Sequence, residues 1–225
     1  MTDLALSRVD KFLAGVSTRP ASRGNLVFAL DATASRERTW DTACQLQARM
    51  FQEVATIGSL SMQLVYFRGA KDLGGECKAS RWVDNPADLA SIMTKIRCDA
   101  GYTQIGRVLG HVAREASRRK VSALVFVGDA CEEDRDQLIE PAKQLAQLGV
   151  PAFMFQEGNE RVARGRFQEI ARITRGVYLA FDQGAARQLS ELLRAVAAFS
   201  VGGTTALERQ SSAAAKYMLQ QIKPR

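Results

Sequence analysis

The chain has 225 residues, of which 46% are apolar and 24% are charged. This composition is ordinary for a globular protein, so it excludes a disordered chain and allows a sizeable core. The length predicts one domain with appended elements, because domains commonly run to about 100–200 residues. The net charge is +7, but the basic residues are scattered and few aromatic residues lie among them. The charge pattern therefore disfavours a nucleic-acid partner.

The cysteine and histidine content disfavours a structural zinc site. The four cysteines form no CxxC pair, and His111 is the single histidine. The N-terminus lacks a basic region followed by an apolar core, and no apolar run approaches the roughly 18–20 residues that span a bilayer. We therefore expect a cytoplasmic protein with reduced thiols and no membrane partner. His111 lies at the edge of a helical apolar stripe, and we expect a structural or solvated role for it.

The first elements in chain order predict a helix, a linker and a buried strand. Apolar spacing predicts a helix over residues 3–16, and the polar segment that follows, up to residue 23, reads as a linker. A continuous apolar run at 26–30 is short enough for a strand buried on both faces. A long helical pattern then runs from about residue 35 to 57, where Gly58 is a natural stop.

Two strands are predicted next, at 61–67 and 76–83. The segment between them is too short for the crossover helix that parallel strands require, so the pair should be antiparallel. An antiparallel strand at a sheet edge fits a mixed sheet. Asn85 and Pro86 then begin a helix, with proline in the first turn.

Helices and strands alternate over the rest of the chain. This order predicts an α/β fold, namely a doubly wound, mostly parallel sheet with one antiparallel edge strand and helices on both faces. Gly202 and Gly203 interrupt the pattern before a last helix. We therefore divide the chain into an N-terminal helix and linker (1–23), a main domain (24–200) and a C-terminal helical extension (201–225). The alternating elements are expected at 104–118, 121–127, 134–148, 152–156, 161–173, 177–181 and 185–199.

Oxygen-bearing side chains follow apolar runs in three separate segments: Asp31, Thr33 and Ser35, then Thr103, then Asp129. In a doubly wound sheet, the loops that leave the carboxyl ends of parallel strands gather at one edge, with a crevice where the winding changes direction. We expect the three segments to meet there. Two carboxylates and three hydroxyls make a site for a hard divalent cation, Mg2+ or else Mn2+ or Ca2+. The set contains no nucleophile with an obvious general base, so we expect a binding module and not an enzyme.

The pattern of these residues resembles the von Willebrand factor A (VWA) domain with its metal-ion-dependent adhesion site, over roughly residues 24–200. The family pattern is Asp-x-Ser-x-Ser, a distant Thr and a distant Asp, and here Thr33 stands for the central serine. The resemblance implies that Thr33, Ser35 and Thr103 are direct ligands, while Asp31 and Asp129 act mostly through bound water. It also implies a Rossmann-like fold.

The resemblance further implies a function in protein–protein interaction or assembly. In many members an open coordination position is filled by an Asp or Glu of the partner, because neutral hydroxyl ligands leave positive charge on the ion. Stand-alone intracellular bacterial members often act with ATPases or chaperones, which makes a partner of that kind the expectation here.

Two alternative functions remain open at this point. An aspartate after the first strand is also typical of Mg-dependent phosphohydrolases that use an aspartyl nucleophile, but these need a second carboxylate where Thr33 stands. A scaffold with a vestigial metal site is the other alternative. Nearby, the acidic residues from Glu132 to Asp136 should lie on the same rim, in the first turn of their own helix. Tyr102 would line the mouth of the site.

Overall fold

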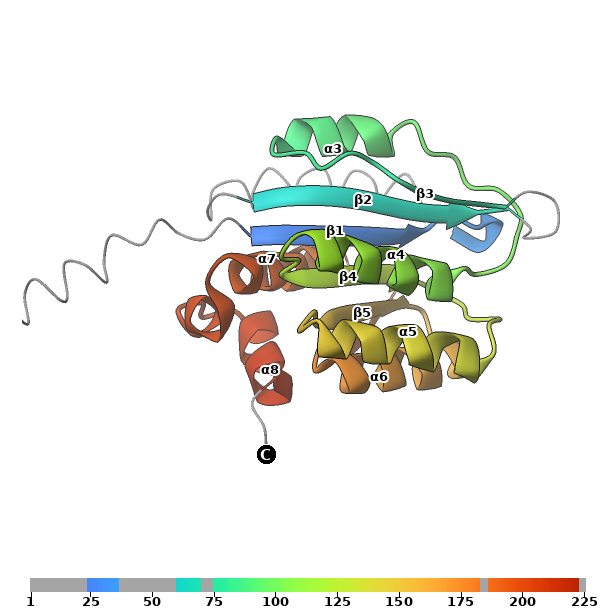
Figure 1. The fold of residues 1–225 in the computed structure, drawn as a ribbon. Coiled ribbons are helices and arrows are strands. Elements are labelled where there is room, and N and C mark those ends of the chain that lie inside the picture. Colours follow the sequence, from blue (N-terminus) through green and yellow to red (C-terminus); the bar gives the residue numbers. More distant parts are fainter. Residues whose placement is uncertain (1–23, 37–59, 70–74, 183–185, 223–225) are drawn as a thin grey trace, which may run out of the picture.

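The protein is described here by a computed structural model, which covers residues 24–36, 60–69, 75–182 and 186–222 (Figure 1). The expected N-terminal helix over 3–16 and the linker lie outside these ranges, as does most of the helix expected over 35–57.

A six-stranded sheet forms the centre of the fold, with the strand order β3-β2-β1-β4-β5-β6. Each neighbouring pair is parallel except β2 and β3, which pair antiparallel. The predicted mostly parallel sheet with an antiparallel edge strand is therefore confirmed. The strands are β1 (Gly24–Asp31), β2 (Leu60–Arg68), β3 (Glu76–Ala79), β4 (Ala123–Gly128), β5 (Ala152–Glu157) and β6 (Val177–Phe181).

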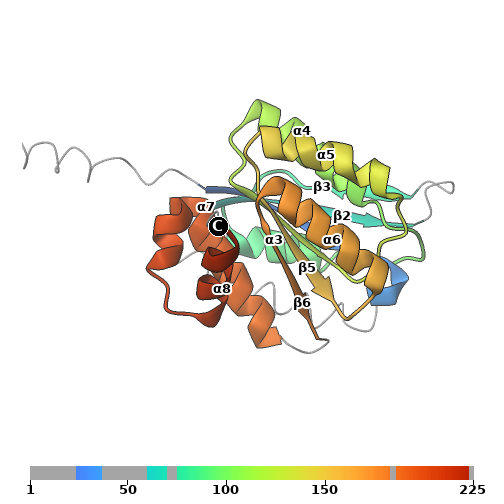
Figure 2. The ribbon, with the colours of Figure 1, turned by 90° about the horizontal axis from the view of Figure 1, so that it is seen from below.

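Helices cover both faces of the sheet, as Figure 2 shows most clearly: α4, α5 and α6 lie on one face, and α3, α7 and α8 on the other. A short 3-10 turn, η1 (Ala34–Arg36), follows β1. No helix in the described ranges is long and apolar enough to cross a membrane. The helices are α3 (Pro86–Met93), α4 (Ile105–Arg118), α5 (Arg135–Gln147), α6 (Arg161–Thr174), α7 (Ala186–Glu208) and α8 (Ala213–Ile222).

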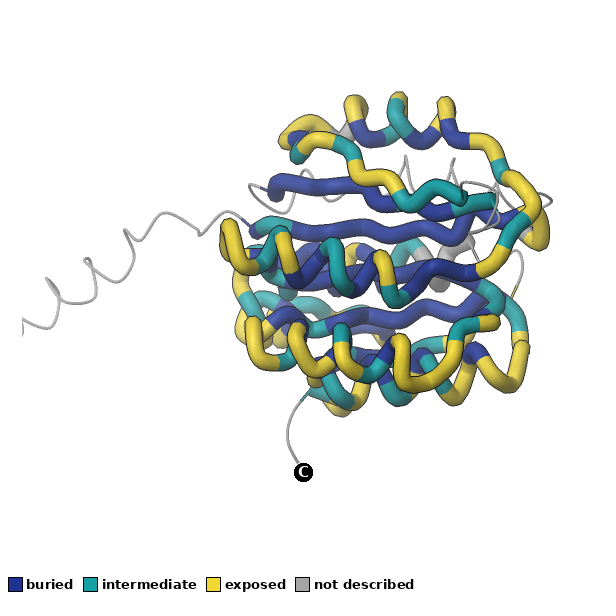
Figure 3. Tube along the Cα trace, turned by 45° about the vertical axis from the view of Figure 1, so that its right-hand side comes forward, coloured by how far each residue is buried: buried dark blue, intermediate teal, exposed yellow. Residues whose placement is uncertain are grey.

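The strands at the centre of the sheet are buried on both faces (Figure 3). Successive side chains of a strand point to opposite faces, so β1 contributes to two apolar layers. Leu26, Phe28 and Leu30 pack in the layer under α3, α7 and α8, whereas Val27 and Ala29 pack in the layer under α4, α5 and α6. The continuous apolar run that predicted this strand is explained by burial from both sides.

Strand β3 is shorter than the predicted strand over 76–83. It ends at Ala79 because the Ser80 side chain enters the ladder: its Oγ accepts a hydrogen bond from the Leu64 amide at 3.0 Å. Pairing with β2 resumes further on as an isolated bridge between Met62 and Val83. A hydroxyl group thus takes one position of the backbone ladder and ends regular pairing at this edge of the sheet.

The C-terminal segment packs back onto the main sheet. Helix α7 runs through Gly202 to Glu208, with a break at Gly203, whose φ of 63° is a left-handed conformation that glycine adopts without strain. After the break the chain folds back as α8, and its apolar stripe is buried in the layer shared with α7. The buried residues of this segment are Leu207, Ala214, Ala215 and Met218.

The burial of Met218 predicts that α8 contributes to the stability of the whole domain. The Met218 side chain is fully buried (0% exposed), so Met218→Ala should lower the free energy of unfolding by about 2–5 kcal/mol. Urea unfolding measures this change. Lys216→Ala on the exposed side of α8 is the matched control and should change stability by less than about 0.5 kcal/mol. Equal effects of the two variants would show that α8 does not pack as described.

His111 has a structural role on α4, as the sequence predicted. It is half-buried, and its Nε2 lies 2.9 Å from Oε1 of Gln63 on β2. Burial lowers the pKa of the imidazole, with further lowering from the charges of Arg114 and Arg118, while Glu115 raises it. The folded protein therefore favours neutral His111 more than the unfolded chain does.

The lowered pKa of His111 predicts a loss of stability in mild acid. Its contribution should be complete above the unfolded-state pKa of about 6.5, and should be lost as the pH falls through the lower folded-state pKa. His111→Gln should lack this part of the decrease. Urea unfolding of both proteins at neutral and mildly acidic pH tests this, because the carboxylates are common to both and His111 is the single histidine. Parallel curves would contradict the prediction.

Candidate functional site

Strands β1 and β4 bring Asp31 and Asp129 to the same edge of the sheet. The two strands pair in parallel with Leu30 opposite Val127, so Asp31 ends β1 beside Gly128, the last residue of β4. A Cβ atom at Gly128 would lie 3.4 Å from the Cβ of Asp31. Asp129 follows directly. Both loops thus leave the sheet at the carboxyl ends of their strands, on the right in Figure 1.

The first segment is held in a tight turn by its own side chains. Asp31 is fully buried, and its Oδ1 accepts a hydrogen bond from the Thr33 amide at 2.8 Å. The Thr33 and Ser35 hydroxyl oxygens lie 3.1 Å apart. Residues two apart along this turn thus direct their oxygens to one side. The turn therefore presents a buried carboxylate and a pair of hydroxyls together.

Thr103, the member of the second segment, is tied to the loop that follows β4. Its amide donates to Oε2 of Glu132 at 3.0 Å, and its Oγ1 accepts from the Glu132 amide at 3.1 Å. A hydroxyl oxygen has two lone pairs. The Glu132 amide uses one of them, so the second lone pair of Thr103 Oγ1 can still face a cation. Thr103 is buried, while its neighbour Tyr102 is 61% exposed and stands at the rim.

The loop that carries Thr103 is also anchored to β1 and β2. The amide of Asp99 donates to the carbonyl of Ala32 at 3.1 Å. Gly101 lies so close to the end of β2 that a Cβ there would be 2.2 Å from the carbonyl carbon of Gly69. Glycine is required at position 101 because the two backbone segments are in direct contact there.

Glu133 has a role that the sequence did not reveal. We expected the acidic residues after Asp129 to lie in the first turn of their own helix, and Asp134 and Asp136 do stand at the start of α5. Glu133 instead accepts hydrogen bonds from Ile105 and Gly106, the first amides of α4. It acts as a cap for a helix whose own N-cap residue makes no side-chain hydrogen bond.

The Glu133 carboxylate is both buried and well bonded. Burial raises its pKa, and the hydrogen bonds from Gly106 and Ile105 lower it, as does a hydrogen bond with the Thr103 side chain. The carboxylate also lies at the positive end of the α4 dipole. Nothing in the spacing of the sequence signals this contact, because the amides it binds lie about 28 residues earlier in the chain.

One oxygen at this edge lacks a partner in the described part of the chain. Oδ1 of Asp129 is buried and accepts no hydrogen bond from any described residue. A buried acceptor without a donor costs about 1–3 kcal/mol, and more when it is charged. A cation, or a water molecule bound to one, would satisfy this oxygen. The residues at this edge therefore fit the divalent cation that the sequence pattern implies.

The ligand types at this edge are those of a hard cation. Mg2+ holds oxygen ligands at about 2.1 Å in octahedral geometry, so adjacent ligands lie about 3 Å apart. The separation of 3.1 Å between the Thr33 and Ser35 hydroxyls is close to this value. Among the described residues, no three His, Cys, Asp or Glu side chains could hold a metal ion by themselves. A cation here would depend on the hydroxyls as well as the two aspartates.

The sequence matches no protein-family model and no curated protein, but the structure is similar to solved ones. A von Willebrand factor type A protein from Catenulispora acidiphila has a TM-score of 0.58 and 16% identity, over 80% of this chain and 43% of that one. The VWA domain of SpRpn10 has a TM-score of 0.56 and 14% identity, over 77% and 95%. The pilus adhesin SpaC of Lactobacillus rhamnosus GG, in an open conformation, has a TM-score of 0.63 and 10% identity, over 80% and 30%.

These similarities, together with the strand order, show that the chain has the VWA fold. The prediction of this fold from the three polar segments is confirmed. A shared fold at such low sequence identity does not test the five proposed metal ligands. They stay a prediction.

The contact between Gly101 and Gly69 predicts a specific sensitivity of the Thr103 loop. Gly101→Ala should force the two backbone segments apart and lower the free energy of unfolding by about 1–3 kcal/mol. The control is Gly165→Ala in α6, where a Cβ meets nothing within 4 Å. That change should raise stability by about 0.5–1 kcal/mol, because alanine favours a helix. Urea unfolding compares the two. An equal gain in both variants would contradict the close contact.

Proposed function

We propose that the chain is a protein-interaction module that holds a divalent cation, Mg2+ in the first instance, at the carboxyl edge of the sheet. Through this ion it would bind a carboxylate of a protein partner. The residues proposed to hold the ion are Asp31, Thr33, Ser35, Thr103 and Asp129.

The observation that carries the proposal is the buried Oδ1 of Asp129, which forms no hydrogen bond with any residue in the described part of the chain. This oxygen lies at the same edge of the sheet as the paired hydroxyls of Thr33 and Ser35. The hydroxyls are held by local structure, since Thr33 is fixed by Asp31 through a backbone hydrogen bond. A site that is already arranged loses little conformational entropy when it binds an ion, which favours binding over rearrangement of the loops.

The charges around the edge would make partner binding depend on the ion. A cation held largely by neutral hydroxyls keeps positive charge, and it attracts an outside carboxylate. The nearby rim is acidic, because Glu132, Asp134 and Asp136 are exposed. Without the ion, these groups would repel an acidic side chain of the partner. The same surface would thus change from repelling to attracting an Asp or Glu when the ion binds.

The fold neighbours support an interaction function but do not define the partner. One of them is a pilus adhesin and two are VWA proteins. An ATPase or a chaperone is the kind of partner that stand-alone members of the family suggest, and we propose it on that ground. We propose no catalytic activity, because Thr33 occupies the position where an aspartyl phosphatase needs its acid.

Metal binding can be tested on the isolated protein. Mg2+ or Mn2+ should raise the stability of the wild type by about 2.7 kcal/mol at a concentration a hundredfold above the dissociation constant. Ser35→Ala/Thr103→Ala should abolish this gain, because it removes two hydroxyls. The matched control, Ser35→Thr/Thr103→Ser, keeps both hydroxyls and should retain it. Thermal unfolding with and without the ion measures the effect, and a crystal soaked in Mn2+ should show anomalous density between the Asp31 and Asp129 loops.

Partner binding is tested separately by capture from cell lysate with Mg2+ and with chelator. Proteins captured by the wild type and by the hydroxyl-retaining control should be lost with chelator and with the alanine double variant. Capture that persists in both would refute the carboxylate bridge. An absent effect of the ion on stability would instead favour the vestigial scaffold, and Mg-dependent hydrolysis of a phosphate ester that Asp31→Asn removes would favour the enzyme.

A further inference from the structure

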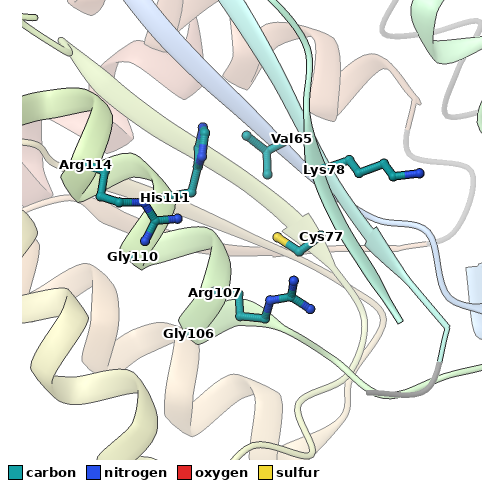
Figure 4. A pocket seen from close by; sticks show the side chains of 8 residues that line it. All are labelled: Val65, Cys77, Lys78, Gly106, Arg107, Gly110, His111 and Arg114. Carbon is teal, nitrogen blue, oxygen red and sulfur yellow. The ribbon is translucent and has the colours of Figure 1, made fainter. Parts of the chain in front are cut away.

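A cavity lies between α4 and the pair of strands β2 and β3, and none of the five proposed ion ligands lines it. Its volume is about 290 Å³. Figure 4 shows that one wall is a face of α4, and that the opposite wall is formed by Val65 and by Cys77, whose sulfur points towards the helix. The residues that line it are Val65, Cys77, Lys78, Gly106, Arg107, Gly110, His111 and Arg114.

Two arginines give the cavity a positive charge. Arg107 and Arg114 lie on the same face of α4, on either side of His111, and both border the cavity (Figure 4). Arg107 donates to the carbonyl of Gly75 at 3.2 Å and to the side chain of Gln104. These acceptors are neutral, so they orient the guanidinium group without cancelling its charge. Neither arginine forms an ion pair with a carboxylate in the described residues.

The carboxylates of the neighbouring elements are already engaged. Glu76 pairs with Lys78 and Arg68 at the edge of the sheet, and in Figure 4 the Lys78 side chain points away from α4. Glu115 accepts a hydrogen bond from Trp82 at 2.7 Å and pairs with Arg118. Burial raises the pKa of the Cys77 thiol, which keeps it neutral. Among the described residues that line the cavity there is no carboxylate. Glu133 reaches the amide of Gly106 at one end, and its oxygens there are already engaged by the amides of Ile105 and Gly106.

Gly110 leaves the cavity open at a cost to the helix. A glycine inside a helix is about 1 kcal/mol less favourable than alanine. No close backbone contact explains it, since a Cβ at Gly110 would meet one atom, the Nη1 of Arg114, at 3.6 Å. Gly106, by contrast, is required by a neighbour, because a Cβ there would lie 3.0 Å from the carbonyl of Gln137. The absence of a side chain at Gly110 therefore keeps the cavity in front of it open.

We propose that this cavity binds a small molecule that carries a phosphate or diphosphate group. The guanidinium groups of Arg107 and Arg114 would bind its oxygens through charge-assisted hydrogen bonds, and Gly110 provides the room. The two arginines are seven residues apart, a rise of about 10 Å along the helix, which suits two linked phosphates better than one. The volume lies at the lower end of the range of small-molecule sites and is too small for a folded partner segment.

The test is calorimetric titration of the full chain with pyrophosphate, in metal-free buffer at constant ionic strength. The wild type should show saturable binding of one pyrophosphate per chain. Arg114→Gln should weaken it at least about tenfold, which corresponds to the loss of one charged hydrogen bond. Gly110→Leu should weaken it similarly without lowering the melting temperature. Arg118→Gln on the same helix, whose side chain is 74% exposed, removes the same charge and should bind as the wild type does.

Two further measurements separate this cavity from other sites. Asp129→Asn should leave pyrophosphate binding unchanged, because the cavity does not involve the proposed ion site. Pyrophosphate should also slow alkylation of Cys77 but not of Cys98, as followed on the individual peptides by mass spectrometry. The proposal is wrong if no saturable binding occurs, if Arg114→Gln and Arg118→Gln weaken binding equally, or if Asp129→Asn abolishes it. Equal weakening would mark a diffuse effect of the net positive charge.

Discussion

The parallel pairing of β1 with β4 is the constraint on which the rest of the molecule depends. Because Leu30 lies opposite Val127, two strands far apart in sequence end side by side, β1 at Asp31 and β4 one residue before Asp129. A shift of one residue would move the side chains of either strand into the opposite apolar layer and disrupt the packing of both layers. The same burial that stabilises the centre of the sheet therefore fixes where the polar loops begin.

The sequence carries much of this information because the signals are local. The apolar run of β1 and the regular alternation of helices and strands predicted the mixed sheet, and the short connection to the segment that became β3 predicted its antiparallel direction. The turn at Asp31, Thr33 and Ser35 was also predictable, because residues two apart in an extended turn share a side.

Contacts between distant segments were not predictable in the same way. Glu132 and Glu133 look like ordinary residues before a helix, yet they bind Thr103 and the start of α4. These contacts depend on how the loop after β4 lies against the loop that carries Thr103. No spacing in the sequence indicates that arrangement. The cavity beside α4 was hidden for a similar reason. Gly110 and Arg114 line a cavity only because folding places β3 opposite them.

The two outer strands bear on how this fold can meet other proteins. At one border, β3 has only four residues, and Ser80 takes over a ladder position where pairing ends. At the other border, the hydroxyl of Tyr217 donates to the carbonyl of Tyr178 in β6 at 3.2 Å. Strands that are short, or whose carbonyls are already satisfied, make poor templates for an incoming strand. The shortness of β3 and the covered Tyr178 carbonyl both make addition of a further strand at these two edges less favourable.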